Sequence, residues 1–390
     1  MCAQGARAQE GYAVSWRDVE QTFGEAIEKG AIPGAVLIAR RGANIEYQGA
    51  FGSRRREPEP APMRLETVFD LSSLTKPLAT AIAAMALLAE GKLKLDERIS
   101  RYLPSLGVHG KGGVTFRHLL AHCSGLAAWR PFYERVAAIE RGGRVNFTAS
   151  RAARDFVYEE IHRERPEAPP GVRAIYSDLN FMLLGEALEQ IGLAQLDRFC
   201  VERIYRPLGL RATGFFDLAL ARVRRIEPIE ERFAATGFCP IRQRILCGEV
   251  DDENAYAMGG VAGHAGLFAP AAEIDRIAVE LMAVWAGRSE FLPRKIVREF
   301  WTRDPAVRGS TWALGWDTPS PAYSSSGRYF SPAAVGHLGF TGTSIWIEPE
   351  SEISIVLLTN RVHPRRDNQA IREFRPMIHN LAMAAMGAGG

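Results

Sequence analysis

A run of small and aliphatic residues from Leu78 to Leu88 is the feature that most restricts how this chain can fold. Pro77 stands directly before it, and proline is tolerated only in the first turn of a helix, so a helix must begin close to this point. Gly91 marks the expected end of that helix. The run is shorter than the ~20 apolar residues that a membrane span needs. We therefore expect a buried helix in the interior of a globular protein.

Two polar residues lie at the start of this helix. Ser73 precedes Lys76 by three residues, which places both side chains on one face of a helix. A serine hydroxyl becomes a good nucleophile when a neighbouring base takes its proton, and an amine one turn away can do so. The free N–H groups of a helix N-terminus also favour developing negative charge. The S-x-x-K pair thus predicts a nucleophilic serine, although an ordinary core helix with a solvated lysine would show the same pattern.

A second motif is Tyr176-Ser177-Asp178, which follows a Pro-Pro-Gly loop signal at 169–171. A tyrosine on a loop can present its phenol to a cleft, and a nearby lysine makes that phenol more acidic. The alternative is a buried tyrosine whose hydroxyl is hydrogen-bonded for structural reasons. The motif therefore predicts a proton-transfer group only in combination with the S-x-x-K pair.

The third motif is the run 336–347, whose second half is rich in β-branched and aromatic residues and predicts a strand. A second apolar run, 353–358, follows closely, so we expect an antiparallel hairpin. Gly339 would let a ligand approach the strand backbone. His337, taken alone, is equally well explained as a core or surface histidine.

These three motifs, in this order, resemble those of the serine β-lactamase and penicillin-binding-protein superfamily, whose members share the S-x-x-K motif. The match is closest to the class C-like branch, which holds class C β-lactamases, DD-peptidases and esterases. Further matching runs lie at 115–126, 183–185 and 259–268, so the resemblance extends over most of the chain. His337-Leu338-Gly339 takes the place of the K-T-G or H-T-G triplet of the superfamily.

The resemblance implies a role for each matching catalytic residue. Ser73 would be the acylated nucleophile, and Lys76 would be its general base or a proton relay. Tyr176 would assist the proton transfer and then help to activate the hydrolytic water. The backbone N–H groups of Ser73 and Phe340 would form the oxyanion hole, where the loss of one donor typically lowers the rate by ~10²–10³.

Four residues are implied in substrate binding: Asp178, His337, Gly339 and Arg361. Asp178 stands where many β-lactamases carry asparagine, and an ionised aspartate can only accept hydrogen bonds. Its charge would also hold Lys76 in the ammonium form. His337 replaces a lysine and is mostly neutral at pH 7, so we expect Arg361 to supply a replacement cation.

The function we expect is a serine hydrolase that works through an acyl-enzyme on small esters or D-amino-acid amides, including peptidoglycan stem peptides. It would be a carboxylesterase or a DD-peptidase without a cofactor. The chain has no G-x-S-x-G elbow of the α/β-hydrolases. The alternatives are a β-lactamase, which Asp178 and His337 disfavour, and a non-catalytic member that binds peptidoglycan or a protein partner.

Composition limits the partners and the compartment. The 390 residues include 48 Lys and Arg against 45 acidic residues, a balance that argues against a general nucleic-acid binder. The arginine clusters at 54–56 and 222–225 are expected in solvated loops. Cys239 and Cys247 are close enough in sequence to pair, but nothing requires it, and no zinc site or other metal site is expected. The run 1–8 lacks the apolar core of a signal peptide, which predicts a cytoplasmic protein, or a periplasmic or secreted one if a signal has been trimmed. The oligomeric state stays open.

The order of predicted elements indicates an α+β fold. A helix over 16–27 ends at Gly30, strands follow at 34–39 and 45–48, and the stretch from 71 to about 220 is mostly helical before strands return from about 337 to 358. Such an order favours one sheet shared by both ends of the chain. The resemblance implies the same β-lactamase/transpeptidase-like fold, an antiparallel sheet of five or more strands flanked by helices. We expect residues 1–70 and 225–390 to form this domain, residues 71–224 to form an inserted helical domain that carries the nucleophile, and the active site to lie between them.

Overall fold

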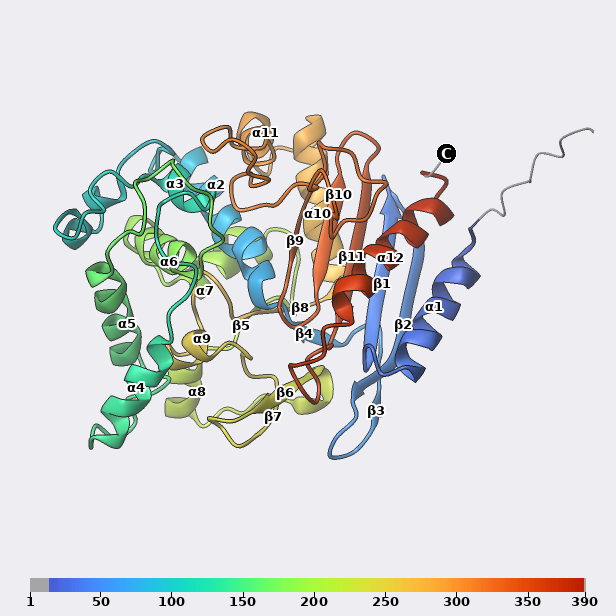
Figure 1. The fold of residues 1–390 in the computed structure, drawn as a ribbon, viewed down its shortest axis with the longest axis horizontal. Helices are drawn as coiled ribbons and strands as arrows, with labels where there is room; N and C mark the ends of the chain where they lie inside the picture. The colour runs from blue at the N-terminus through green and yellow to red at the C-terminus, as the bar shows by residue number, and fades with distance from the viewer. Residues whose placement is uncertain (1–13, 389–390) are drawn as a thin grey trace, which may run out of the picture.

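The centre of the fold is a six-stranded antiparallel sheet, seen on the right of Figure 1. A computed structural model describes residues 14–388, so the run 1–8 and the expectation about a signal peptide lie outside the described residues. The strand order is β3-β2-β1-β11-β10-β9. The strands are β1 (Gly34–Arg41), β2 (Asn44–Arg55), β3 (Ala61–Pro62), β9 (Val335–Leu338), β10 (Ser344–Glu348) and β11 (Ile353–Thr359). Both ends of the chain therefore build one sheet, as the sequence predicts.

The two faces of this sheet pack against different helices, because successive side chains of a strand point to opposite sides. Leu37 lies in a core with α1 (Trp16–Glu28) and α12 (Ile371–Ala385), which cover the outer face in Figure 1. Its neighbour Ile38 lies in the larger core on the other face, where α10 (Ala271–Ala286) packs against β11. The sheet thus separates a small core from the core that surrounds the S-x-x-K helix.

The part of the chain between these strands is mostly helical. Its helices are α2 (Ile82–Ala89), α3 (Phe116–Leu120), α4 (Phe132–Arg141), α5 (Arg151–Arg163), α6 (Asp178–Gly192), α7 (Leu196–Cys200), α8 (Leu218–Arg224) and α9 (Glu253–Ala257), and α11 (Arg294–Phe300) follows α10. Its shorter turns are η1 (Ser72–Leu74), η2 (Lys76–Ala81), η3 (Ile99–Arg101), η4 (Pro104–Gly107), η5 (Val201–Tyr205) and η6 (Glu230–Arg232). The division into a sheet domain of residues 1–70 and 225–390 and a helical domain of residues 71–224 stays a prediction.

Strands return earlier than the sequence predicts. A three-stranded sheet has the order β4-β8-β5, and β6 and β7 form a separate hairpin. The strands are β4 (Val68–Asp70), β5 (Gly214–Phe215), β6 (Ala235–Cys239), β7 (Arg244–Cys247) and β8 (Leu267–Pro270). Each has five residues or fewer, which is too short for a two-residue alternation of apolar side chains to be recognised.

The run that carries the S-x-x-K motif is a core element. Among the described residues, the helical run Ser72–Ala89 is long and apolar enough to span a membrane, but 78% of it is buried inside the protein, as expected for a core helix. Within residues 14–388, no group of three or more His, Cys, Asp or Glu side chains is placed to hold a metal ion. Cys239 and Cys247 are free thiols. In the β6–β7 hairpin, Cys239 lies opposite Arg244 and Cys247 lies opposite Ala235, so the two cysteines do not face each other.

Candidate active site

Ser73 lies on the tight turn η1, which leads into the buried helix and contacts β9. Ser72 has a φ of 48°, and its N–H donates to the Asp70 carboxylate at 2.8 Å. The following turn η2 has the wide π geometry and contains Pro77, which has no N–H to donate. The buried helix therefore begins close to Pro77, as the sequence predicts.

The hydroxyl of Ser73 is held between two groups that can exchange protons. Lys76 Nζ donates to Ser73 Oγ at 3.0 Å, and the Tyr176 hydroxyl donates to the same oxygen at 2.7 Å. Lys76 is fully buried, donates also to the His264 carbonyl at 3.1 Å, and lies 2.7 Å from Asp178 Oδ1. The structure thus brings together four of the residues that sequence analysis selected, although they come from distant parts of the chain.

The charges at this centre are set by Asp178. Burial disfavours the ammonium form of Lys76, but the Asp178 carboxylate and the Tyr176 oxygen together outweigh burial and raise the pKa of Lys76. Burial raises the pKa of the Tyr176 phenol, although the Lys76 ammonium opposes this effect. Both groups are therefore protonated at neutral pH, and the coupled pair has to lose one proton before either member can act as a base.

Tyr176 and Asp178 are placed by a helix start. Ser177 is the N-cap of α6: its Oγ accepts from Asn180 N–H at 3.3 Å and donates to the Ala127 carbonyl at 2.6 Å. Asp178 is the first residue of α6, where the free N–H groups favour a carboxylate. The loop that the Pro-Pro-Gly signal predicts therefore ends at a rigid cap, which fixes the phenol and the carboxylate together.

His337 on β9 is neutral. Its side chain is buried, and Nδ1–H donates to the Leu338 carbonyl at 2.8 Å. Burial, together with the Lys76 charge, lowers the pKa of His337 to about 3. Its Nε2 has no hydrogen-bond partner among the described residues. His337 therefore carries no positive charge, whereas a lysine at this position would be a cation.

Gly339 lies where the strand and the nucleophile turn come close together. A Cβ atom at this position would lie 2.6 Å from the Leu71 carbonyl oxygen, so the glycine allows the nucleophile turn to approach the strand. The neighbouring Phe340 N–H donates to Ser72 Oγ at 3.3 Å. One of the two predicted oxyanion-hole donors thus has a side-chain acceptor in this structure.

Arg361 does not lie in the cleft as a free cation. It is buried, its Nε donates to the Phe340 carbonyl at 2.7 Å, and its Nη1 donates to the carbonyls of Arg366 and Asn368 at 3.2 and 2.9 Å. The guanidinium also stacks on the Phe340 ring, 4.5 Å from its centroid. This placement corrects the expectation of a replacement cation, because these contacts support the Phe340 turn.

Sequence analysis missed two residues that surround Tyr176. The His122 carbonyl accepts from Ile175 N–H at 2.8 Å, and His122 Nδ1 accepts from Ser177 N–H at 3.1 Å, so His122 clamps the segment on both sides of the tyrosine. Trp312 stacks on the Tyr176 ring at a centroid distance of 5.4 Å. His122 belongs to the matching run 115–126, which was the available signal, but Trp312 lies in no motif.

A comparison with known families agrees with this geometry. The family model described as beta-lactamase matches residues 19–375. The chain belongs to the beta-lactamase family. Among beta-lactamase-family relatives, a protein of Escherichia coli K12 named "Putative D-alanyl-D-alanine carboxypeptidase" is 33% identical over 356 residues, 85% of this chain and 79% of the relative. A Bacillus subtilis 168 protein named N-acetylmuramyl-L-alanine amidase is 32% identical over 369 residues, 89% of this chain and 81% of the relative.

Solved structures share the beta-lactamase-family fold. Simvastatin synthase (LovD) of Aspergillus terreus has a TM-score of 0.71 and 21% identity, covering 96% of this chain and 99% of that one. EstCE1, a hydrolase with promiscuous acyltransferase activity, has a TM-score of 0.68 and 23% identity, and the match covers 93% of this chain and 98% of EstCE1. At these identities the likeness concerns the fold, which confirms the α+β architecture expected from the sequence.

Proposed function

We propose that this beta-lactamase-family protein is a serine hydrolase in which Ser73 is acylated, and that its substrates are D-amino-acid amides, including peptidoglycan stem peptides, or small esters. The observation that carries the proposal is the position of Ser73 Oγ, 3.0 Å from Lys76 Nζ and 2.7 Å from the Tyr176 hydroxyl. The names of the two bacterial relatives, a carboxypeptidase and an amidase, support amide substrates.

The proposed reaction begins when the Lys76–Tyr176 pair has lost one proton. The pair then takes the proton of Ser73, whose Oγ attacks the substrate carbonyl carbon and forms a new C–O bond. The N–H groups of Ser73 and Phe340 stabilise the oxyanion. The leaving amine or alcohol departs with the proton that the pair returns, and a water molecule, deprotonated by the same pair, hydrolyses the acyl-enzyme.

The charges around Ser73 also accommodate an acyl substrate without a carboxylate next to the reacting bond. Lys76 is ion-paired with Asp178, His337 is neutral, and Arg361 donates to backbone carbonyls. Lys76 and His337 therefore offer no free positive charge to the carboxylate that penicillins and D-alanyl-D-alanine peptides both carry, and the Arg361 guanidinium is buried. A small neutral ester is therefore the second candidate substrate.

The test is the intact mass of the protein after incubation with benzylpenicillin, compared between wild type and Ser73→Ala. We expect an adduct, or hydrolysed penicillin in solution, with wild type alone. The exposed Ser105 offers a matched control, because Ser105→Ala should behave as wild type. Hydrolysis of p-nitrophenyl acetate and release of D-alanine from an acylated D-Ala-D-Ala dipeptide then separate esterase from peptidase activity. If Ser73→Ala keeps full activity on every substrate, or if wild type has none, Ser73 is not the nucleophile of a hydrolase.

A further inference from the structure

A solvent-exposed surface on α8 and the neighbouring loop combines large apolar side chains with arginines. Val145 and Val223 are 79% and 81% exposed, and Ile226 is half exposed. We call this surface the α8 patch, and its members are Arg141, Arg144, Val145, Leu220, Arg222, Val223, Arg224, Arg225 and Ile226. The sequence suggested solvated loops for the arginine cluster, but the structure places Arg222 and Arg224 on a helix.

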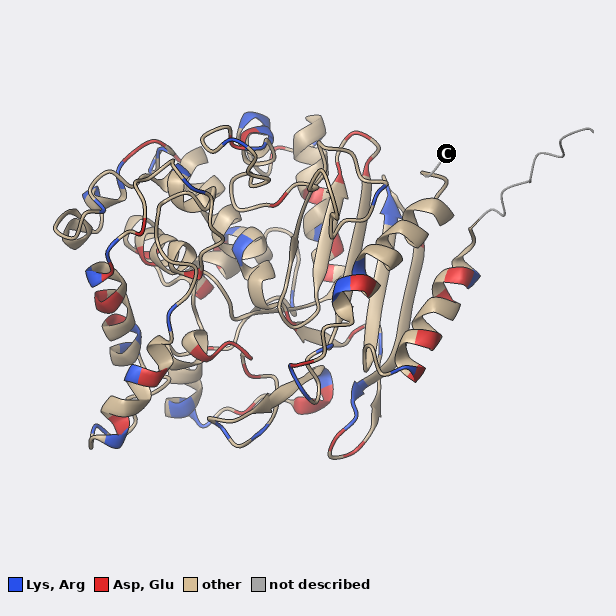
Figure 2. Ribbon diagram, in the orientation of Figure 1, with Lys and Arg blue, Asp and Glu red and all other residues tan. Residues whose placement is uncertain are grey.

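The α8 patch is one continuous surface. Arg222 on α8 donates to the carbonyls of Asn146 and Thr148 at 3.2 and 2.9 Å, which ties the helix to the loop after α4. Arg141 and Arg222 also line the same cavity. In Figure 2, ribbon segments in the blue of basic residues lie on α8 and at the end of α4, at the lower left of the molecule.

The patch carries a net positive charge and is bordered by Glu140, which lines a cavity together with Arg141 and Arg222. Neither 141–146 nor 218–226 contains an acidic residue. Asp217, directly before α8, is ion-paired with Arg151, which lies outside the patch. Within residues 14–388, the five arginines of the patch have no ion-pair partner.

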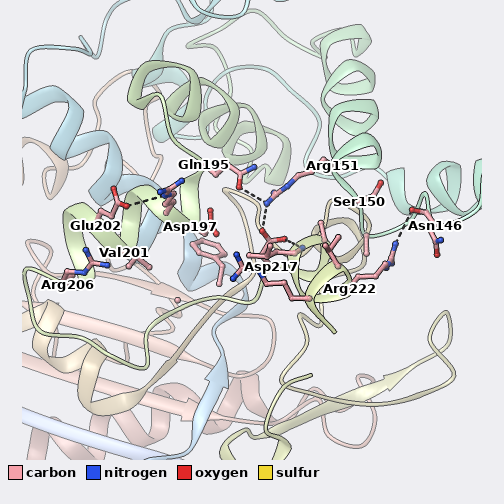
Figure 3. A pocket seen from close by; sticks show the side chains of 18 residues that line it. Asn146, Ser150, Arg151, Gln195, Asp197, Val201, Glu202, Arg206, Asp217 and Arg222 are labelled. Atoms are coloured by element: carbon pink, nitrogen blue, oxygen red, sulfur yellow. Dashed lines mark hydrogen bonds and ion pairs between the residues drawn. The ribbon is translucent and has the colours of Figure 1, made fainter. Parts of the chain in front are cut away.

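A cavity of about 910 Å³ adjoins the patch between α8 and η5 (Figure 3). Arg222 and Asn146 lie at one end of this cavity, and Arg206 and Glu202 lie at the other. Glu202 is paired with Arg198, whereas Arg206 has no ion-pair partner in the part of the chain that the structure describes. Asp197 and Asp217 also line this cavity, so it holds charges of both signs beside the patch.

We propose that the α8 patch binds the surface of an anionic lipid bilayer. Exposed aliphatic side chains flanked by arginines are what interfacial helices use to enter the headgroup region, where the arginines attract anionic lipids. A second copy of the chain seated on the same patch would bring like charges together. The exposed valines would not contribute to binding a nucleic acid, since single strands are bound by stacking of bases on aromatic rings.

The test is co-sedimentation with vesicles of mixed phosphatidylcholine and phosphatidylglycerol at low salt, with phosphatidylcholine vesicles as reference. We expect wild type to bind the anionic vesicles, and high salt to weaken binding. Arg224→Gln with Arg225→Gln should lower the partition coefficient about 30-fold. Val223→Ser should lower it about tenfold at unchanged charge. Arg17→Gln with Lys295→Gln removes the same two charges from exposed positions on α1 and α11 and should have little effect.

Three results would overturn the proposal. Wild type that does not sediment with anionic vesicles excludes this partner. Equal losses in the two double variants would mean that net charge, not the patch, drives binding. Binding to a nucleic acid without binding to vesicles, or a dimer that only the patch variants lose, assigns the patch to another partner. Unfolding midpoints measured without vesicles show that each variant is folded.

Discussion

Replacing Asp178 by asparagine removes the carboxylate that lies 2.7 Å from the buried ammonium of Lys76. At this separation and an effective dielectric constant of about 20, the attraction between the two charges is about 6 kcal/mol. Desolvation of the ions offsets part of it, and breaking one partner of a buried pair typically costs about 3–5 kcal/mol. Asp178→Asn should therefore change both the pH at which the enzyme works and its stability.

The pH dependence of activity has a definite sign. The Asp178 carboxylate raises the pKa of Lys76 and opposes ionisation of the Tyr176 phenol. Without it, the coupled pair loses its proton at lower pH, whichever member is the base. In Asp178→Asn, the limb on which kcat/KM rises with pH should move down by about one to three pH units. The measurement is a profile of ester hydrolysis from about pH 5 to 11.

The pH dependence of the free energy of unfolding should have the opposite sign in wild type and in Asp178→Asn. In wild type the raised pKa of Lys76 adds stability below the unfolded value of about 10.4, and that stability is lost as the pH rises through the folded value. In Asp178→Asn, burial without a counter-charge depresses the pKa of Lys76. The variant should then gain stability as the pH rises from that depressed value to about 10.4. Urea unfolding at several pH values measures both slopes.

The control is Asp155→Asn, which removes a carboxylate that is 66% exposed and 3.7 Å from Arg154. It should leave the profile and the stability close to wild type, because exposed pairs contribute ~0–1 kcal/mol. If Asp178→Asn is folded and its rising limb stays where it is in wild type, Asp178 does not control the base, and the Lys76–Asp178 ion pair does not set the charges around Ser73.

Two further substitutions test the turn opposite Ser73. Gly339→Ala should lower the free energy of unfolding in urea by about 1–3 kcal/mol and abolish most activity, because the added Cβ would meet the Leu71 carbonyl. The control is Gly24→Ala, which should be neutral or stabilising because its Cβ would meet nothing within 4 Å. Equal effects of the two alanines would contradict the close approach. Ser72→Ala should tighten the binding of a boronic-acid inhibitor by up to about tenfold, because the Phe340 N–H would no longer have to break its hydrogen bond to Ser72 Oγ. Unchanged affinity would show that this 3.3 Å contact does not restrain the oxyanion hole.

The parts of the site that could be predicted are those with local patterns. The spacing of Ser73 and Lys76 depends on residues within one helical turn, so the sequence carries it directly. The contact of Ser72 with Phe340 and the stacking of Trp312 on Tyr176 join residues more than a hundred positions apart. Such contacts leave no periodicity in the sequence.

The same distinction holds for the fold. The helix that ends near Gly30 has a clear apolar period, and β1 and β11 are continuous apolar runs that the sequence also indicates. The sharing of one sheet by both chain ends follows from the order of elements. The short strands from 214 to 270 have no clear apolar period, and their pairing depends on tertiary contacts. For Arg361, the sequence indicates a positive charge but not the direction in which the side chain points. Hydrogen bonds to nearby backbone carbonyls fix the position of the guanidinium.

The pairing of β1 with β11 has a consequence for how the protein is made. Ala35 pairs with Thr359, so β1 leaves the ribosome long before its partner is synthesised. At about 5–20 residues per second, the interval is roughly 15–60 s. During this time one edge of a buried, apolar strand is open to pairing with other nascent chains. The main sheet can therefore form only after residues 353–359 have been translated. Expression at a lower growth temperature or with added chaperones should raise the soluble yield.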